Sequence, residues 1–160
     1  DSDQQGLFPF ASEFGRWKNC EEGDFQQEAL NAVRELTARE GDCYTHPSDL
    51  AVLTRTNEVA SNVATFLNDN GFPTVHLYDD DGEKSRHKMR SFFKGDGRIK
   101  VCTLHSFKGW EVWGVVVCFS GGGGPALQKC QLYTVMSRAI GGISVLNASP
   151  VFDEMEELFD

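Results

Sequence analysis

The chain has 160 residues, of which 40% are apolar and 11% aromatic, enough for one globular domain with a substantial core and too few for two. Its formal net charge of −9 argues against a freestanding nucleic-acid binder but leaves room for a local basic groove. No apolar run approaches a membrane span in length and no signal segment opens the sequence, so no membrane partner is expected. The five widely spaced cysteines favour a reduced, cytoplasmic compartment.

Helical and strand patterns alternate along most of the chain. Residues 1–23 carry scattered aromatic side chains and are expected to form an irregular arm or an edge strand. Apolar side chains then recur at helical spacing, first behind a capping box of Asp24 and Gln27 and again behind Asn57. The predicted helices cover 24–40, 57–70, 85–93, 126–140 and 151–159, and the predicted strands 50–54, 74–78, 99–104, 115–119 and 143–146. Such alternation favours an α/β fold, a largely parallel sheet with helices on both faces.

The densest group of polar side chains follows the predicted strand at 99–104. Its members are His105, Ser106, Lys108, Gly109 and Glu111. Open α/β sheets bind ligands beside the carboxyl ends of their strands. An ordinary connection between two strands fits the same pattern, and the pattern alone does not separate these two interpretations.

Two arginines stand in apolar surroundings. Arg55 follows the strand at 50–54, and Arg138 lies on the otherwise apolar helix predicted at 126–140. Burying an unpaired guanidinium is costly, so each needs an anion. That anion is either an internal carboxylate or a phosphate, which suits the fork of guanidinium donors.

Other features point less clearly to a function. The four glycines at 121–124 predict a loop, and the absence of a following Gly-Lys pair excludes a G-x-x-x-x-G-K-[ST] phosphate loop. The basic residues between 84 and 94 are expected on a solvated helix face. Cys102 and His105 form a single C-x-x-H pair, so no metal site is expected. For Trp110 and Trp113, core packing is favoured over base stacking.

Four segments share the order and spacing of known motifs. Thr-x-His-Ser-x-Lys-Gly-x-Glu at 103–111 is similar to motif V, and Asp-Leu-Ala-Val-Leu-Thr-Arg at 49–55 to motif IV, of the UvrD/Rep-like superfamily 1 DNA helicases. Residues 66–73 resemble the Leu…Gly-(Ile/Phe)-Pro segment that comes after motif IV, and Leu-Tyr-Thr-Val-Met-Ser-Arg-Ala at 132–139 resembles motif VI. The resemblance implies a second RecA-like domain over residues 24–160, preceded by the arm at 1–23.

The resemblance also implies roles for particular residues. In this family the arginines of motifs IV and VI reach the ATP γ-phosphate across an interdomain cleft, which implies catalytic roles for Arg55 and Arg138. Three residues would bind ATP, with the last of them at the ribose hydroxyl: Lys108, Gly109 and Glu111. Three others would face single-stranded DNA: Thr103, His105 and Ser106.

The chain differs from the family pattern at several points. Thr54 stands where many members have an aromatic residue that packs on adenine, and Trp110 replaces a common leucine. The Walker motifs of a first RecA-like domain are absent, so ATP with Mg²⁺ would be shared with that missing domain, which would supply the metal ligands. The expected function is the carboxy-terminal motor half of an ATP-dependent single-stranded-DNA translocase or helicase, inactive in ATP hydrolysis by itself. The alternative is a non-catalytic nucleic-acid- or protein-binding module that retains the helicase fold.

Overall fold

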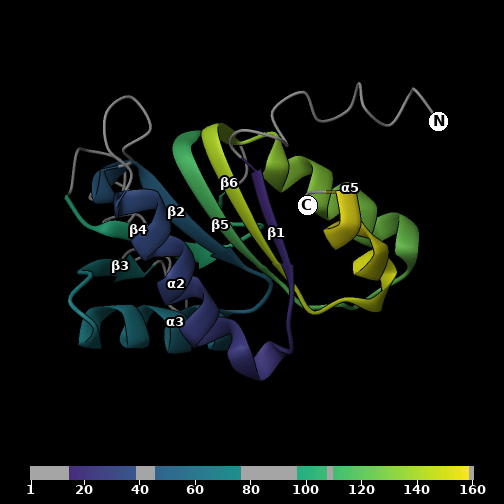
Figure 1. Cartoon of the computed structure of the whole chain (residues 1–160), viewed down its shortest axis with the longest axis horizontal. Helices are drawn as coiled ribbons and strands as arrows, with labels where there is room; N and C mark the ends of the chain where they lie inside the picture. Colours follow the sequence, from purple (N-terminus) through teal and green to yellow (C-terminus); the bar gives the residue numbers. More distant parts are fainter. Residues whose placement is uncertain (1–14, 39–45, 77–96, 108–109, 159–160) are drawn as a thin grey trace.

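A parallel sheet organises the chain. The computed structural model describes residues 15–38, 46–76, 97–107 and 110–158. Within these residues six strands pair in the order β1-β6-β5-β2-β4-β3, and every pair is parallel (Figure 1). The strands are β1 (Gly15–Asn19), β2 (Leu50–Thr54), β3 (Thr74–His76), β4 (Ile99–Thr103), β5 (Val112–Phe119) and β6 (Ala139–Asn147).

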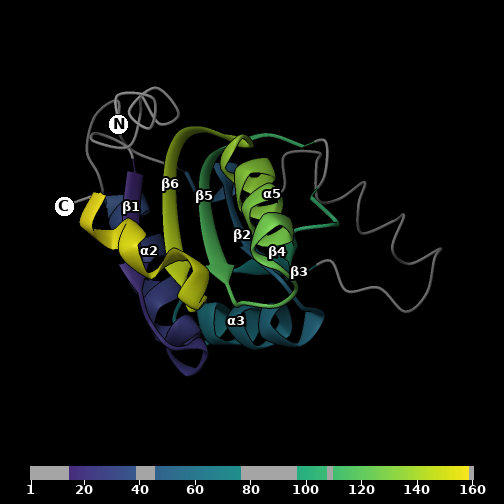
Figure 2. The same cartoon turned by 90° about the vertical axis from the view of Figure 1, so that its right-hand side faces the viewer.

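Helices cover both faces of this sheet. The α-helices are α2 (Phe25–Ala38), α3 (Asn57–Asp69) and α5 (Pro125–Met136), and the 3₁₀ segments are η1 (Glu22–Asp24), η3 (Pro47–Asp49) and η4 (Pro150–Leu158). One core layer joins α2 and α3 to the sheet, and a second joins α5 and η4 to its other face (Figure 2). The predicted α/β fold with helices on both faces is therefore confirmed.

The central strands are buried on both sides, as parallel strands between two helical layers must be. All of β2 is buried, with Val52 facing the α2–α3 layer and Leu53 the α5 layer. The helical spacing predicted for α2 is also confirmed, because Phe25, Ala29 and Val33 are all buried.

The end of α5 and the start of β6 differ from the prediction. The helix predicted to reach residue 140 ends at Met136, since Ser137 and Arg138 close it with hydrogen bonds to the carbonyls of Tyr133 and Val135. β6 then begins at Ala139 instead of 143, because Ala139 pairs with Val112 in β5. Tertiary pairing with β5 here overrides a local pattern that continues the helix. The short helix predicted after β6 is present from Pro150 to Leu158, and it is a 3₁₀ helix.

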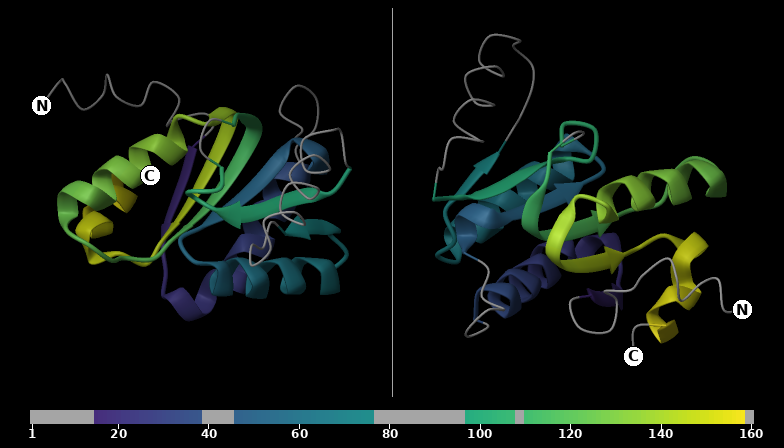
Figure 3. Two further views of the ribbon diagram at one scale, coloured as in Figure 1. Left: turned by 180° about the vertical axis from the view of Figure 1, so that it is seen from behind. Right: turned by 90° about the horizontal axis from the view of Figure 1, so that it is seen from above.

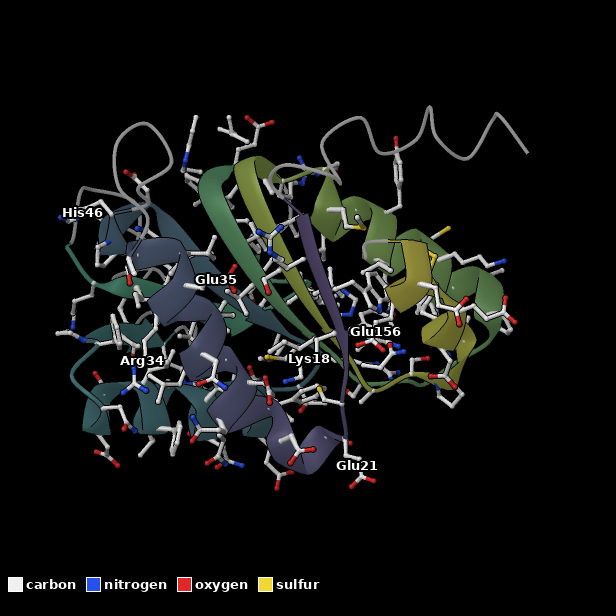
Figure 4. The ribbon with its side chains drawn as sticks, viewed as in Figure 1. Lys18, Glu21, Arg34, Glu35, His46 and Glu156 are labelled. Atoms are coloured by element: carbon white, nitrogen blue, oxygen red, sulfur yellow. The ribbon has the colours of Figure 1, made fainter. Side chains whose placement is uncertain are left out.

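The first described residues form an edge strand. β1 pairs with β6 from Gly15 to Asn19, and two ion pairs tie it to α2: Arg16 to Glu35 at 3.2 Å and Lys18 to Glu28 at 2.9 Å. Figure 4 shows Lys18 and Glu35 on these two elements. The described part of the arm predicted for residues 1–23 thus includes a strand of the sheet, and the sheet starts before the predicted boundary at residue 24.

Some predictions lie outside the described residues. They concern the end of the strand at 77–78, the helix at 85–93 with its basic residues, and residues 108–109. Within the part of the chain that the structure describes, no helix is both long and apolar enough to cross a membrane.

Candidate functional site

The predicted site residues that the structure describes lie along two opposite edges of the sheet. Because the described strands are all parallel, residues that follow β2, β4 and β5 line one edge, named here the carboxyl edge. Residues that precede β5 and β6 line the other, the amino edge. In Figure 2, β5 points downward, so the carboxyl edge is at the bottom of the view, and Figure 3 (right) looks down on the amino edge.

A tight turn after β4 presents polar groups at the carboxyl edge. The Thr103 Oγ1 and Ser106 Oγ atoms are 3.1 Å apart, and the Leu104 N–H donates to the Thr54 carbonyl over 2.8 Å. Leu104 and Phe107 are buried in the α5 layer, whereas His105 and Ser106 are exposed. Two apolar anchors therefore fix the turn, in which His105 and Ser106 are exposed and Thr103 is buried.

Arg55 lies at the same carboxyl edge. It follows β2 directly, is half-buried, and donates from Nη1 to the Gly121 carbonyl in the loop after β5. Between residues that the structure describes, the ion pairs are Arg16–Glu35 and Lys18–Glu28, so no described carboxylate neutralises Arg55. An internal carboxylate was one of the two anions expected to pair with Arg55, and none does so among the described residues.

Arg138 and Glu111 lie together at the amino edge. The Val112 N–H donates to the Arg138 carbonyl over 3.1 Å, which places Glu111 and Arg138 on adjacent strand starts. Arg138 is half-buried, and its Nε is fully buried with no hydrogen-bond partner among the described residues. A buried donor without an acceptor costs about 1–3 kcal/mol, so the described part of the chain leaves this guanidinium short of an acceptor.

The two arginines are not brought together. Arg55 lies beside the carboxyl end of β5 and Arg138 beside its amino end, and eight strand residues separate these ends. At a rise of about 3.3 Å per residue the separation is about 23 Å, far beyond the reach of an arginine side chain. The expectation that both contact one γ-phosphate does not fit this arrangement within a single domain.

Two indoles stand near the amino edge. Trp110 is 38% and Trp113 42% exposed, so the prediction that both pack in the core is wrong. The Trp113 ring lies over Gly141 of β6, where a Cβ atom would overlap the indole. Because Gly141 has no side chain, the Trp113 indole can pack on its backbone outside the core. The local sequence does not reveal this contact between two strands.

Four candidate residues remain: Cys102, His105, Lys108 and Gly109. Lys108 and Gly109 lie outside the described residues. Cys102 is fully buried in β4 while His105 is exposed, so the two do not converge. Across the described ranges no three His, Cys, Asp or Glu side chains gather into a group that could hold a metal. Any magnesium ion bound with ATP would need ligands from elsewhere.

Comparison with known proteins identifies the fold. Models of protein families give no match to the sequence. Curated protein sequences give none either. Solved structures match well: Saccharomyces cerevisiae Dbp5 bound to RNA and ADP BeF3 has a TM-score of 0.64 at 13% identity, over 93% of this chain and 38% of that one. The C-terminal domain of a possible DNA helicase from Lactobacillus plantarum has a TM-score of 0.60 at 13% identity, over 92% of this chain and 84% of that one.

This chain has the fold of a helicase C-terminal RecA-like domain. A third match is the Pyrococcus furiosus Hef helicase domain, with a TM-score of 0.55 at 20% identity, over 83% of this chain and 27% of that one. The RecA-like domain therefore spans about a quarter of the Hef chain and well under half of the Dbp5 chain. At these identities the likeness establishes the fold of the RecA-like domain and nothing finer.

Proposed function

We propose that this RecA-like domain is the carboxy-terminal motor half of an ATP-dependent helicase of the UvrD/Rep-like group, working with a first RecA-like domain on single-stranded DNA. The fold supports the helicase part, and the segments similar to motifs IV, V and VI support the group. The observation that carries the proposal is the buried, unpaired Nε of Arg138 beside Glu111.

ATP is proposed to bind at the amino edge. Arg138 would contact the γ-phosphate and stabilise the charge that develops there during transfer. Glu111 would accept a hydrogen bond from the ribose, and by resemblance Lys108 and Gly109 would hold the phosphates. ATP with Mg²⁺ supplies the phosphoryl group, and the metal ligands would come from the first domain. Arg55 is left out of this site because it lies at the other edge.

Single-stranded DNA is proposed to bind at the carboxyl edge. Hydroxyl groups of Thr103 and Ser106 and the imidazole of His105 would donate to backbone phosphates, which hold the strand without reading its sequence. The chain from Thr103 to Val112 runs from this edge back to the amino edge, where β5 starts. One short segment of the sequence therefore connects the two proposed sites.

The test is ATP turnover by a protein that contains this domain and the first one. Arg138→Ala should lower kcat by about 10³–10⁵ while changing the KM for ATP far less, because the contact strengthens in the transition state. Arg34→Ala is the control, since Arg34 is exposed on α2 (Figure 4). Normal turnover in Arg138→Ala would remove the residue from its proposed role.

A non-catalytic binding module is the second candidate. The net charge of −9 favours it, as does Thr54, which is fully buried, donates to the Thr56 carbonyl and cannot stack on a base. This candidate predicts binding of nucleic acid or protein without ATP turnover in the two-domain protein. Turnover stimulated by single-stranded DNA and lost in Arg138→Ala would exclude it.

A further inference from the structure

A groove opens on the surface where the helices that follow β1 and β2 begin. It has a volume of about 500 Å³ and lies between the amino ends of α2 and α3. Because β1 and β2 are parallel and each helix follows its strand, the groove lies at the carboxyl edge of the sheet. Its volume falls within the range of about 300–1,000 Å³ that is usual for ligand sites.

The floor of the groove is apolar. Phe25 of α2 and Val63 of α3 line it, are 1% and 0% exposed, and belong to the core layer that joins these helices to the sheet. Val59 is half-buried, packs against the same layer and also lines the groove. The groove therefore offers a surface on which the methylene groups of a ligand can be buried.

Two carboxylates line the groove, one from each side. Glu22 lies in η1, directly before α2, and Glu58 lies in the first turn of α3, and both residues are exposed. Neither carboxylate forms an ion pair with another described residue. Arg55 is only three positions before Glu58, but it donates to the Gly121 carbonyl instead. Within the described ranges the groove thus has two negative charges that no cation neutralises.

The helix ends beside the groove have caps from their own chain. The Thr56 Oγ1 accepts a hydrogen bond from the Val59 N–H at the start of α3. Before α2, the Asp24 carboxylate accepts from the Glu21 N–H as part of a capping box (Glu21 is labelled in Figure 4). Helix amino ends attract anions through free N–H groups, and these caps and the two carboxylates reduce that attraction. The groove therefore suits a cation, and it repels ATP and nucleic acid, which are both polyanions.

An arginine side chain matches the floor, the carboxylates and the remaining polar groups of the groove. Its methylene stem can lie on the apolar floor, and its guanidinium carries five N–H donors in a planar fork that bonds well to carboxylates. The side-chain amides of Gln26 and Asn62 also line the groove, and their oxygens can accept the donors that the carboxylates leave over. A lysine ammonium is a point charge with three donors, so it would use fewer of these acceptors.

We propose that the groove between the amino ends of α2 and α3 is a docking site for an arginine side chain of a partner polypeptide. This docking site is additional to the proposed function, because its ligand is a cation, whereas the ligands proposed for the two sheet edges are anions. A partner held by this arginine would lie at the carboxyl edge, the edge proposed for single-stranded DNA. The net charge of −9 would draw such a basic partner toward the chain.

Nuclear magnetic resonance tests the site, with the peptide acetyl-Gly-Arg-Gly-amide titrated into the isotope-labelled 160-residue chain. Saturable shifts are expected at the backbone amides of Glu22, Gln26, Glu58 and Asn62. Glu22→Gln and Glu58→Gln should each weaken binding by about threefold, and the double variant by about tenfold, because each change removes one charged acceptor. Glu157→Gln is the matched control and should bind like wild type, since it loses the same charge on η4, which packs on the other face of the sheet.

Two altered peptides separate recognition of arginine from general charge attraction. Citrulline in place of arginine keeps the shape and loses the charge, so this peptide should bind at least about tenfold more weakly. Lysine keeps the charge and loses the fork of donors, so that peptide should bind about threefold more weakly than the arginine peptide. Equal binding of the arginine and lysine peptides would overturn the proposal.

The same spectra show whether each variant is folded and where the peptide binds. Wild-type affinity in the double variant Glu22→Gln with Glu58→Gln would overturn the proposal, and so would shifts confined to residues outside the groove. If the groove signals of the peptide-free chain change with protein concentration, a second copy of the chain occupies the groove and the proposal is wrong.

Discussion

Arg55 and Arg138 occupy opposite edges of one parallel sheet, although the resemblance to the UvrD/Rep-like helicases implies that both contact a single phosphate. Arg55 bonds to the Gly121 carbonyl beyond the carboxyl end of β5, and the Arg138 carbonyl accepts from Val112 at its amino end. One edge can therefore serve a nucleic acid and the other a nucleotide. In the proposed function, this separation would let hydrolysis at one site move a strand held at the other.

The unpaired Nε of Arg138 has a measurable cost in stability. Arg138→Met keeps much of the side-chain volume and removes the buried donor, so we expect the free energy of unfolding of the chain to rise by about 1 kcal/mol. Urea unfolding of wild type and variant measures the difference. Residues that serve a function are often retained although they lower the stability of the fold.

Arg55→Met is the matched comparison for this prediction. It removes the hydrogen bond that Arg55 donates to the Gly121 carbonyl, so the free energy of unfolding should fall by about 1 kcal/mol. Opposite signs for the two variants would support a hydrogen-bonded Arg55 and an Arg138 whose Nε has no acceptor. A loss of stability in Arg138→Met as large as in Arg55→Met would show that Arg138 is paired within the chain.

The fold was largely predictable because most of its strands are short apolar runs between amphipathic helices. β2 was predicted with its bounds, since a strand buried on both faces reads as an uninterrupted apolar run. β6 was not, because Ala139 to Gly142 owe their strand conformation to pairing with β5. Pairing between distant segments leaves no periodicity in the local sequence.

The site was predictable as a set of residues but not as an arrangement. His105 and Ser106 were expected beside a strand end, and they lie there exposed. The separation of Arg55 from Arg138 has a signal in the sequence, since one follows a strand and the other precedes one, and in a parallel sheet these positions face opposite edges. The close approach of the Arg55 guanidinium to Gly122 has no such signal, because the two residues are 67 positions apart in the chain.

The buried pair of Gln128 and Ser149 should be energetically coupled. Ser149→Ala or Gln128→Ala leaves the other side chain with an unmet buried hydrogen bond, so each should lower the free energy of unfolding by about 1–3 kcal/mol. The double variant should lose about 1 kcal/mol less free energy of unfolding than the two single variants lose together, because both single variants break the same hydrogen bond. Urea unfolding of all four proteins completes the cycle, and strict additivity would mean that the bond contributes nothing.

The three tryptophans should differ in their access to solvent. Trp17 is 6% exposed, whereas Trp110 and Trp113 are 38% and 42% exposed. Acrylamide should quench most of the native emission, and Trp110→Phe with Trp113→Phe should leave a blue-shifted, poorly quenched signal from Trp17. Trp17→Phe is the reciprocal control and should leave the quenchable emission in place. Equal quenching of these two variants would contradict the exposed positions of Trp110 and Trp113 at the amino edge.

Two buried thiols should make the domain sensitive to alkali. Burial raises the pKa of Cys102 to about 12 and also raises the pKa of Cys118, whereas a thiol in the unfolded chain has a pKa of about 8.5. The folded state keeps these protons to higher pH, so their contribution to stability is complete below about pH 8.5 and is lost as the pH rises toward the folded values.

The expected loss is about 1.4 kcal/mol per pH unit for each thiol above pH 8.5 or so. Urea unfolding at several alkaline pH values measures the slope. Cys102→Ala with Cys118→Ala should reduce it, leaving the share of half-buried Cys20, whose pKa burial raises to about 11. Cys130→Ala is the matched control, since Cys130 is exposed, and it should keep the wild-type slope. If removing both buried thiols leaves the slope unchanged, other groups cause the alkaline loss and the two cysteines do not ionise on unfolding.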